Sequence, residues 1–140
     1  MDRKEIKEQI IQIVKGMEGK IGKEKLGALF NKDDGIGCNQ FRDLASTCRQ
    51  ADCYEEIELL VQYSTAKAKI TKNKKTNKWE EKSWKTKISD GRTFGELVVS
   101  CMREVREIDP THAQEMYLLE LFFGYLYWQS RIWSERKRGH

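Results

Sequence analysis

Apolar side chains recur at intervals of three and four residues along much of this chain, which is the spacing of one face of a helix. Over residues 2–18 the pattern is carried by Ile6, Ile10, Ile13, Val14 and Met17. Glycines at positions 16, 19, 22 and 27 then lower the helical propensity, so a short helix is expected over residues 23–31 and a turn over residues 33–37. The N-terminal part therefore predicts one long and one short helix.

Two more amphipathic helices are expected before residue 70. Asn39 is a candidate N-cap of the first, whose apolar residues begin at Phe41. Asp52, with Glu55 three residues later, has the spacing of a capping box and predicts a helix that continues to about Ala68.

The last third of the chain has the strongest helix signals. Thr93 and Glu96 form a capping-box pair ahead of an amphipathic stretch, and Thr111 and Gln114 repeat the same start signal. In the final helix, apolar and aromatic residues cover nearly the whole circumference. A helix of this kind is either central to its domain or half covered by another chain. Trp133, which lies among basic residues, is the better candidate for an interface.

Residues 71–87, between the fourth and fifth predicted helices, show no sustained apolar period. We therefore expect residues 66–92 to form a long, solvated, basic loop. The sequence as a whole predicts a single all-α domain over residues 1–140, a compact bundle of five to six helices with this loop between the fourth and the fifth.

The charge of the chain is concentrated in the same segment. The net charge is +4, but residues 67–87 hold nine lysines and two glutamates, a net charge of +7, so the rest of the chain sums to −3. A neutral-to-acidic body with one basic segment is suited to a polyanion such as nucleic acid. Because lysine contacts phosphates as a point charge, binding should be largely independent of base sequence.

Two tryptophans interleave with the loop lysines and offer flat surfaces on which bases can stack. The candidate contacts in the loop are Lys72, Lys74, Lys75, Lys78, Trp79, Lys82, Trp84, Lys85 and Lys87. The alternative is a solvated lysine-rich loop whose tryptophans pack back onto the core.

The sequence lacks the residues that several other functions require. The four cysteines do not have zinc-site spacing, and the two histidines, His112 and His140, form no helical pair or cluster, so no metal or other cofactor is expected. An enzyme is not expected either, because no acid–base constellation can be assembled. The N-terminal residues are charged, and no apolar run approaches the ~20 residues needed to span a bilayer. A soluble cytoplasmic protein is therefore expected, without membrane contact.

Three stretches resemble one known family. Asn39-Gln40-Phe41-Arg42 is similar to the Gln-hydrophobic-Arg sequence at the start of a helix in that family. Leu59 to Lys69 (LLVQYSTAKAK) is similar to its apolar helix that ends in Tyr, small residues and a basic residue. Phe122-Phe123, followed by Arg131, is similar to its terminal aromatic helix. In their order and spacing these stretches resemble the small subunit of the type III-A CRISPR effector, the Csm complex.

The resemblance implies a non-catalytic all-α subunit that acts in antiviral defence and binds the backbone of guide RNA and target RNA. It also implies packing of several copies beside one another, beside the repeated backbone subunit and against the large subunit. Arg42, Lys67, Lys69 and Arg131 are the helical positions expected to contact RNA. The equivalent type III-B small subunit is the close alternative. A different alternative is a helical protein-interaction module whose basic loop binds an acidic partner.

Overall fold

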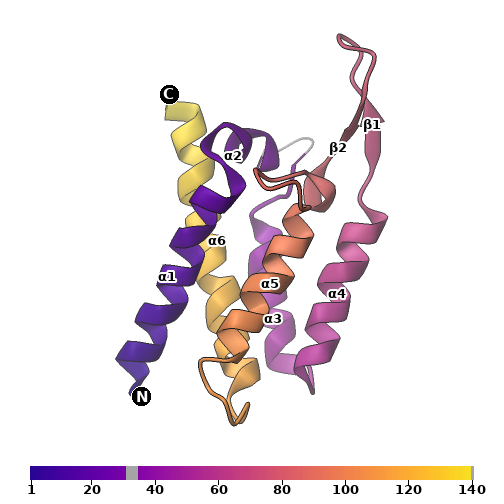
Figure 1. The fold of residues 1–140 in the computed structure, drawn as a ribbon. Helices are drawn as coiled ribbons and strands as arrows, with labels where there is room; N and C mark the ends of the chain where they lie inside the picture. The colour runs from indigo at the N-terminus through magenta and orange to yellow at the C-terminus, as the bar shows by residue number, and fades with distance from the viewer. Residues whose placement is uncertain (31–34, 140) are drawn as a thin grey trace.

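The computed structural model describes residues 1–30 and 35–139, with side chains described as far as residue 135. Residues 31–34 and 140, which include part of the predicted turn, lie outside it. The helices are α1 (Arg3–Ile21), α2 (Lys23–Leu29), α3 (Asn39–Gln50), α4 (Tyr54–Lys67), α5 (Phe94–Arg106) and α6 (Glu115–Gly139). Two short strands, β1 (Ile70–Lys72) and β2 (Trp79–Glu81), and a 3₁₀ turn, η1 (Ser83–Lys85), join α4 to α5. The predicted all-α bundle is confirmed (Figure 1).

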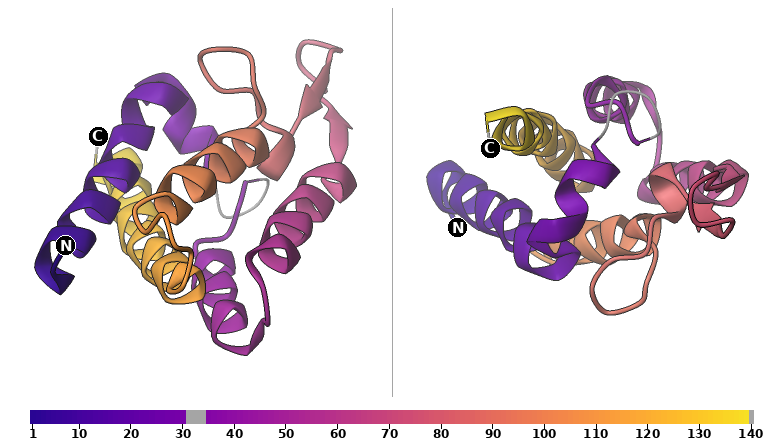
Figure 2. Two further views of the ribbon diagram at one scale, coloured as in Figure 1. Left: turned by 60° about the horizontal axis from the view of Figure 1, so that its bottom comes forward. Right: turned by 90° about the horizontal axis from the view of Figure 1, so that it is seen from above.

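Helices α3, α4, α5 and α6 run in alternating directions, and α1 lies beside α6 (Figures 1 and 2). Helix α6 packs against α1, α2, α3 and α5, most extensively against α3. This central position explains its apolar circumference, since Phe122, Phe123 and Leu126 are fully buried. Helix α4 lies at the edge of the bundle, where it packs mainly against α5 and η1.

The interior contains a cluster of aromatic rings from distant parts of the chain. Phe30 contacts Phe41 and Phe94 edge to face, with ring centroids 6.1 and 5.9 Å apart, and stacks on Trp133 at 5.4 Å. The indole nitrogen of Trp133 donates a 2.8 Å hydrogen bond to Glu18. Only 1% of Trp133 is exposed, so its prediction as an interface residue is wrong. A partner for the indole N–H is available inside the fold, which lets the side chain be buried.

Of the four predicted helix starts, that of α5 is confirmed in detail. The Thr93 hydroxyl accepts a 3.1 Å hydrogen bond from the Glu96 N–H, and the Glu96 carboxylate accepts one of 3.1 Å from the Thr93 N–H. These bonds satisfy backbone groups that a helix N-terminus leaves free. They also lower the pKa of Glu96, the backbone bond from Thr93 contributing most.

The start signals of α3 and α4 are displaced. Asn39 is the first residue of α3 and follows Cys38, which makes no side-chain cap. Helix α4 begins at Tyr54 after Cys53, and the Asp52 N–H donates to the Glu56 carboxylate at 3.4 Å instead of Asp52 capping the helix. Both predictions are wrong in position, because Cys38 and Cys53 are the residues that directly precede the two helices and neither helix has a side-chain cap, although each helix exists.

The start of α6 is displaced by a turn. The N–H groups of Thr111 and Gln114 donate to the Asp109 carboxylate, and His112 has a positive φ of 59°. Asp109 therefore caps this turn, and α6 begins only at Glu115. The Thr111–Gln114 capping box is not formed because the Thr111 hydroxyl is itself bonded to Asp109.

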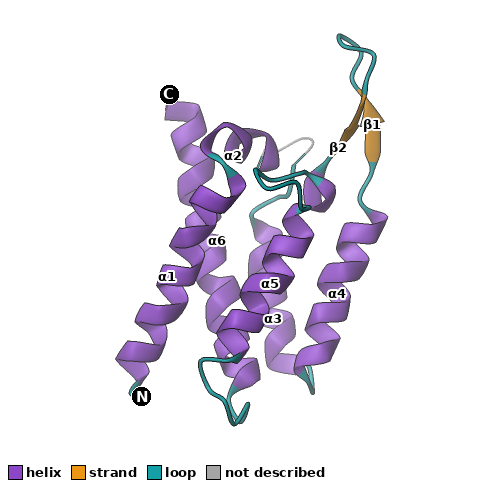
Figure 3. Cartoon of the chain, in the orientation of Figure 1, coloured by secondary structure: helices purple, strands orange, loops and turns teal. Residues whose placement is uncertain are grey.

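The segment expected as a long loop is ordered locally. Strands β1 and β2 form an antiparallel hairpin in which Ile70, Thr71 and Lys72 pair with Glu81, Glu80 and Trp79. The hairpin projects beyond the bundle from the end of α4 (Figure 3). Turn η1 and a bridge between Lys87 and Thr93 complete the connection. The long loop expected over residues 66–92 is therefore not confirmed. The sequence did not reveal these strands, because three residues are too few to produce an apolar period.

The four cysteines are free thiols in two environments, which predicts their reactivity. Burial raises the pKa of Cys48 and of Cys101 to about 12, whereas Cys53 is exposed and Cys38 half-buried. Because the thiolate is the nucleophile, iodoacetamide at pH 8 should modify Cys53 and Cys38 in the native protein and reach Cys48 and Cys101 only after denaturation. Mass spectrometry of digests would check this, and rapid native labelling of Cys101 would contradict the observed packing.

Candidate nucleic-acid interface

A basic groove lies where α4 ends and the hairpin begins. It has a volume of about 660 Å³ and is lined by Gln40, Ser64, Lys67, Ala68, Lys69, Thr71, Lys82, Ser83 and Trp84. The C-terminal turn of α4 supplies Lys67, the following segment Lys69, and the residue after β2 Lys82. Three predicted contact lysines therefore line one concave surface, together with hydroxyl groups that can bond phosphate oxygens.

Trp84 forms the inner wall of this groove instead of a stacking surface. It is 3% exposed, and its indole N–H donates a 3.0 Å hydrogen bond to the Gln40 side chain. Its ring contacts Phe41 and Phe94, with centroids 5.9 and 5.6 Å away. The prediction that Trp84 stacks on bases is therefore wrong. The alternative considered for the tryptophans, packing onto the core, holds for this one.

The tip of the hairpin is shaped by Asn73. Its side-chain oxygen accepts hydrogen bonds from the N–H groups of Lys75 and Thr76, at 2.8 and 3.2 Å. Asn77 has a φ of 62°, a left-handed conformation that asparagine tolerates in turns. The tip therefore has a defined turn, and it holds Lys74, Lys75 and Lys78 exposed to solvent.

The two faces of the hairpin differ. Lys72 is directly opposite Trp79 and shares a face with it, and 69% of Trp79 is exposed. On the other face Glu80 accepts hydrogen bonds from Asn73 at 2.6 Å and Lys82 at 2.9 Å. These bonds, that from Lys82 first, lower the pKa of Glu80. An exposed indole beside an ammonium group is an arrangement that can stack a base and contact its phosphate.

The lysines of this region are not equally available. Lys82 is paired with Glu80, and Lys87 is 3.9 Å from Glu81. Among the side chains that the structure describes, Lys67, Lys69, Lys72, Lys74, Lys75, Lys78 and Lys85 are in no ion pair. The groove and the hairpin tip thus keep most of their positive charge for a ligand.

The structure does not bring Arg42 and Arg131 to this groove. Arg42, on α3, lies over the Tyr127 ring at 5.8 Å and lines a separate hollow with residues of α6, among them Tyr125 and Trp128. Arg131 is exposed on α6. The predicted contacts are therefore divided between two parts of the molecule.

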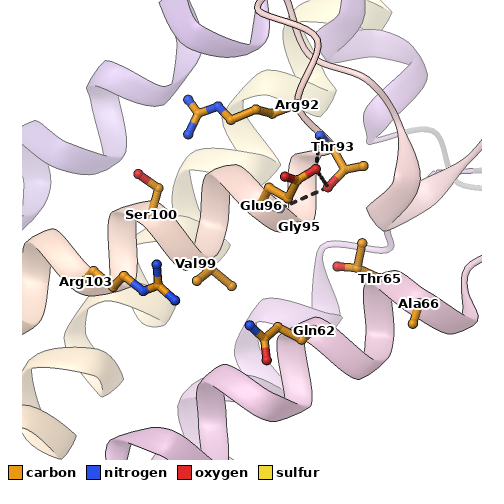
Figure 4. Close-up of a pocket in the computed structure, with 10 residues that line it drawn as sticks. All are labelled: Gln62, Thr65, Ala66, Arg92, Thr93, Gly95, Glu96, Val99, Ser100 and Arg103. Atoms are coloured by element: carbon orange, nitrogen blue, oxygen red, sulfur yellow. Dashed lines mark hydrogen bonds between the residues drawn. The ribbon is translucent and has the colours of Figure 1, made fainter.

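A second hollow lies between α4 and α5 and has a volume of about 680 Å³ (Figure 4). Its two guanidinium groups are already engaged, since Arg103 binds both Glu58 oxygens, at 3.0 and 3.2 Å, and Arg92 binds Asp90 at 2.8 Å. The hydrogen bond from Arg103 is the largest cause that lowers the pKa of Glu58. This hollow therefore lacks the unpaired basic side chains that distinguish the basic groove.

Sequence reasoning missed the polar rim of the basic groove. Gln40 belongs to the Asn39–Arg42 stretch singled out above, but nothing in the sequence places it beside Ser64, Thr71 and Ser83. These contacts arise from packing between segments that are far apart in the chain. Lys67 and Lys69 were the signals that pointed to this end of α4.

Three observations bear on other functions. Within the described part of the chain, no three His, Cys, Asp or Glu side chains gather as a metal ion would require. No helix in the same residues combines the length and the apolar character needed to cross a membrane. Comparisons with protein-family models, with curated proteins and with solved structures found no match.

Proposed function

We propose that the protein is a non-catalytic, RNA-binding subunit of a CRISPR effector, equivalent to the small subunit of the type III-A complex. It would bind the backbone of guide and target RNA without base specificity and pack against copies of itself, the repeated backbone subunit and the large subunit. The family assignment rests on the three stretches of sequence described above. The RNA-binding part rests on the structure as well.

The observation that carries the proposal is the gathering of unpaired lysines at the end of α4. Lys67 and Lys69 line the groove, and Lys72, Lys74 and Lys75 are exposed on the hairpin that follows it, so the end of α4 and the hairpin together carry a cluster of ammonium groups. Neutralising phosphates releases counterions, which supplies sequence-independent affinity. The exposed indole of Trp79 adds a surface for an unpaired base.

Binding to single-stranded RNA should weaken when the charge of this surface is reversed. We expect Lys67→Glu with Lys69→Glu to lower affinity at least about tenfold and to reduce the slope of log affinity against log salt by about 1.4, or 0.7 for each phosphate contact. Lys74→Glu with Lys75→Glu tests the hairpin tip in the same way. Fluorescence anisotropy with several unrelated RNA sequences, at a series of salt concentrations, measures both quantities.

The matched control is Lys4→Glu with Lys15→Glu, which makes the same change of net charge on exposed positions of α1. Helix α1 lies on the opposite side of the bundle from the hairpin (Figure 1). If the control variant loses as much affinity as the groove variant, binding is not localised. If neither the groove nor the tip variant differs from the wild type, the RNA-binding proposal is wrong.

The alternative of a protein-interaction module has its own support in the structure. Trp128 is 63% exposed beside Tyr125, with ring centroids 5.6 Å apart, on a face that has no lysine cluster. An acidic protein partner on the hairpin would be lost with the same lysine substitutions, but the wild type would then show no affinity for RNA. The anisotropy measurement therefore separates the two functions.

A further inference from the structure

The exposed face of α4 has an apolar stripe that the fold leaves uncovered. Leu59 is 66% exposed and Tyr63 59% exposed, and Ala66 follows three residues later on the same face. The opposite face of the helix buries Tyr54, Ile57 and Val61. Two large apolar side chains one turn apart on a peripheral helix favour contact with another surface.

The charges at the two ends of this stripe have opposite signs. Glu56 is in the first turn of α4 and Lys67 in the last. They are eleven residues apart, about three turns, so both lie on the same flank of the stripe. Among described side chains neither has an ion-pair partner: Glu56 accepts a 3.4 Å bond from the Asp52 N–H, and Lys67 lies 5.0 Å from the ring of Tyr63. When two copies of this face are placed antiparallel, the glutamate of each copy therefore lies opposite the lysine of the other.

We propose that two copies of this chain associate through α4, antiparallel and about a two-fold axis that lies between the two helices at the level of Val61. In this arrangement Leu59 packs against Tyr63 of the partner subunit, and Glu56 meets Lys67 of the partner subunit. A two-fold axis makes each contact occur twice, as in other isologous dimers. Antiparallel pairing also places the partly positive N-terminus of each helix beside the partly negative C-terminus of the other, which is favourable.

The size of the face predicts a weak dimer. Helix α4 has 14 residues and is about 21 Å long, so the buried area falls at the small end of specific interfaces. Dissociation should therefore be visible as a dependence on protein concentration. This dimer is separate from the packing of several copies in the proposed function and is argued from α4 alone. It shares Lys67 with the basic groove, so RNA and a second copy would compete for this side chain. The dimerisation test contains no RNA and includes Leu59→Asp, which changes no proposed RNA contact, so either proposal can fail without the other.

Sedimentation velocity of the full chain, over about a hundredfold range of concentration, should show a monomer that converts to a dimer. Glu56→Lys and Lys67→Glu should each weaken the dimer about tenfold, because each replaces two attractions with two repulsions. An equimolar mixture of these two variants should recover dimerisation, since both pairs are again attractive in the mixed dimer. Leu59→Asp should abolish it.

Lys15→Glu, a matched charge change on α1, should leave dimerisation unaltered. Circular dichroism of every variant checks that the exposed substitutions leave the fold intact. A wild type that stays monomeric at the highest concentration would overturn the inference. So would a dimer that is indifferent to Leu59→Asp, a mixture that does not recover, or assembly beyond the dimer, which would mean an open head-to-tail contact.

Discussion

Trp84→Ala should lower the free energy of unfolding by about 3–5 kcal/mol, which is the usual cost of removing a buried tryptophan. The ring is in contact with Phe41 and Phe94, and its N–H bond to Gln40 joins the connection after the hairpin to the start of α3. The substitution leaves a cavity and an unpaired Gln40 amide oxygen. Because Trp84 lines the basic groove, RNA affinity should fall as well.

Trp79→Ala is the matched control for this prediction and should lower RNA affinity without lowering stability. Trp79 is 69% exposed, so stability should stay within about 0.5 kcal/mol of the wild type. Affinity for single-stranded RNA should nevertheless fall by about 1–3 kcal/mol if a base stacks on the indole. Urea denaturation and anisotropy on both variants would test the pair. Equal stability losses at the two positions would contradict the structure of the hairpin.

Gly95→Ala should destabilise the protein by about 1–3 kcal/mol, even though alanine is the better helix former. Helices α4 and α5 approach closely at this residue, and a Cβ on Gly95 would lie 2.8 Å from the Cβ of Thr65. The Thr65 hydroxyl already donates to the Val61 carbonyl at 2.9 Å, so its position is held. The helices would therefore have to separate.

Two further variants make this prediction specific, and urea denaturation measures all of them. Gly124→Ala, in α6, has open space around the added Cβ and should stabilise the protein by up to about 1 kcal/mol through helix propensity. Thr65→Ala in the Gly95→Ala background should recover part of the loss, because it removes two of the three atoms in the way. If Gly95→Ala is as harmless as Gly124→Ala, the close contact between α4 and α5 is wrong.

Local patterns in the sequence were sufficient for the existence of the helices. The capping box of Thr93 and Glu96 was predicted correctly, and both of its hydrogen bonds are present, because the two residues lie within one helical turn. The starts of α3, α4 and α6 were less well predicted, because the residue at which each helix begins depends on the turn before it; α3 and α4 have no side-chain cap. At α6 Asp109 bonds the turn first and delays the helix to Glu115.

The candidate site was predicted only in its composition. The excess of lysine is visible in the sequence, but which lysines are paired is not, because the pairs Lys82–Glu80 and Lys87–Glu81 depend on the backbone path after β2, which has no sequence period. Arg42 was expected with the groove lysines and lies in another hollow, since its neighbour two residues earlier, Gln40, faces the groove from the other side of the helix.

The sequence by itself determined the helical class and the segregation of charge, because both depend on spacings of three or four residues and on local composition. Only the tertiary structure decided the roles of the tryptophans. Trp79 and Trp84 both lie among lysines in the sequence, and Trp128 and Trp133 lie five residues apart in one helix, yet Trp84 and Trp133 are buried and Trp79 and Trp128 exposed. The physical reason is that an indole is buried when a distant segment provides both apolar contacts and an acceptor for its N–H, as Gln40 and Glu18 do.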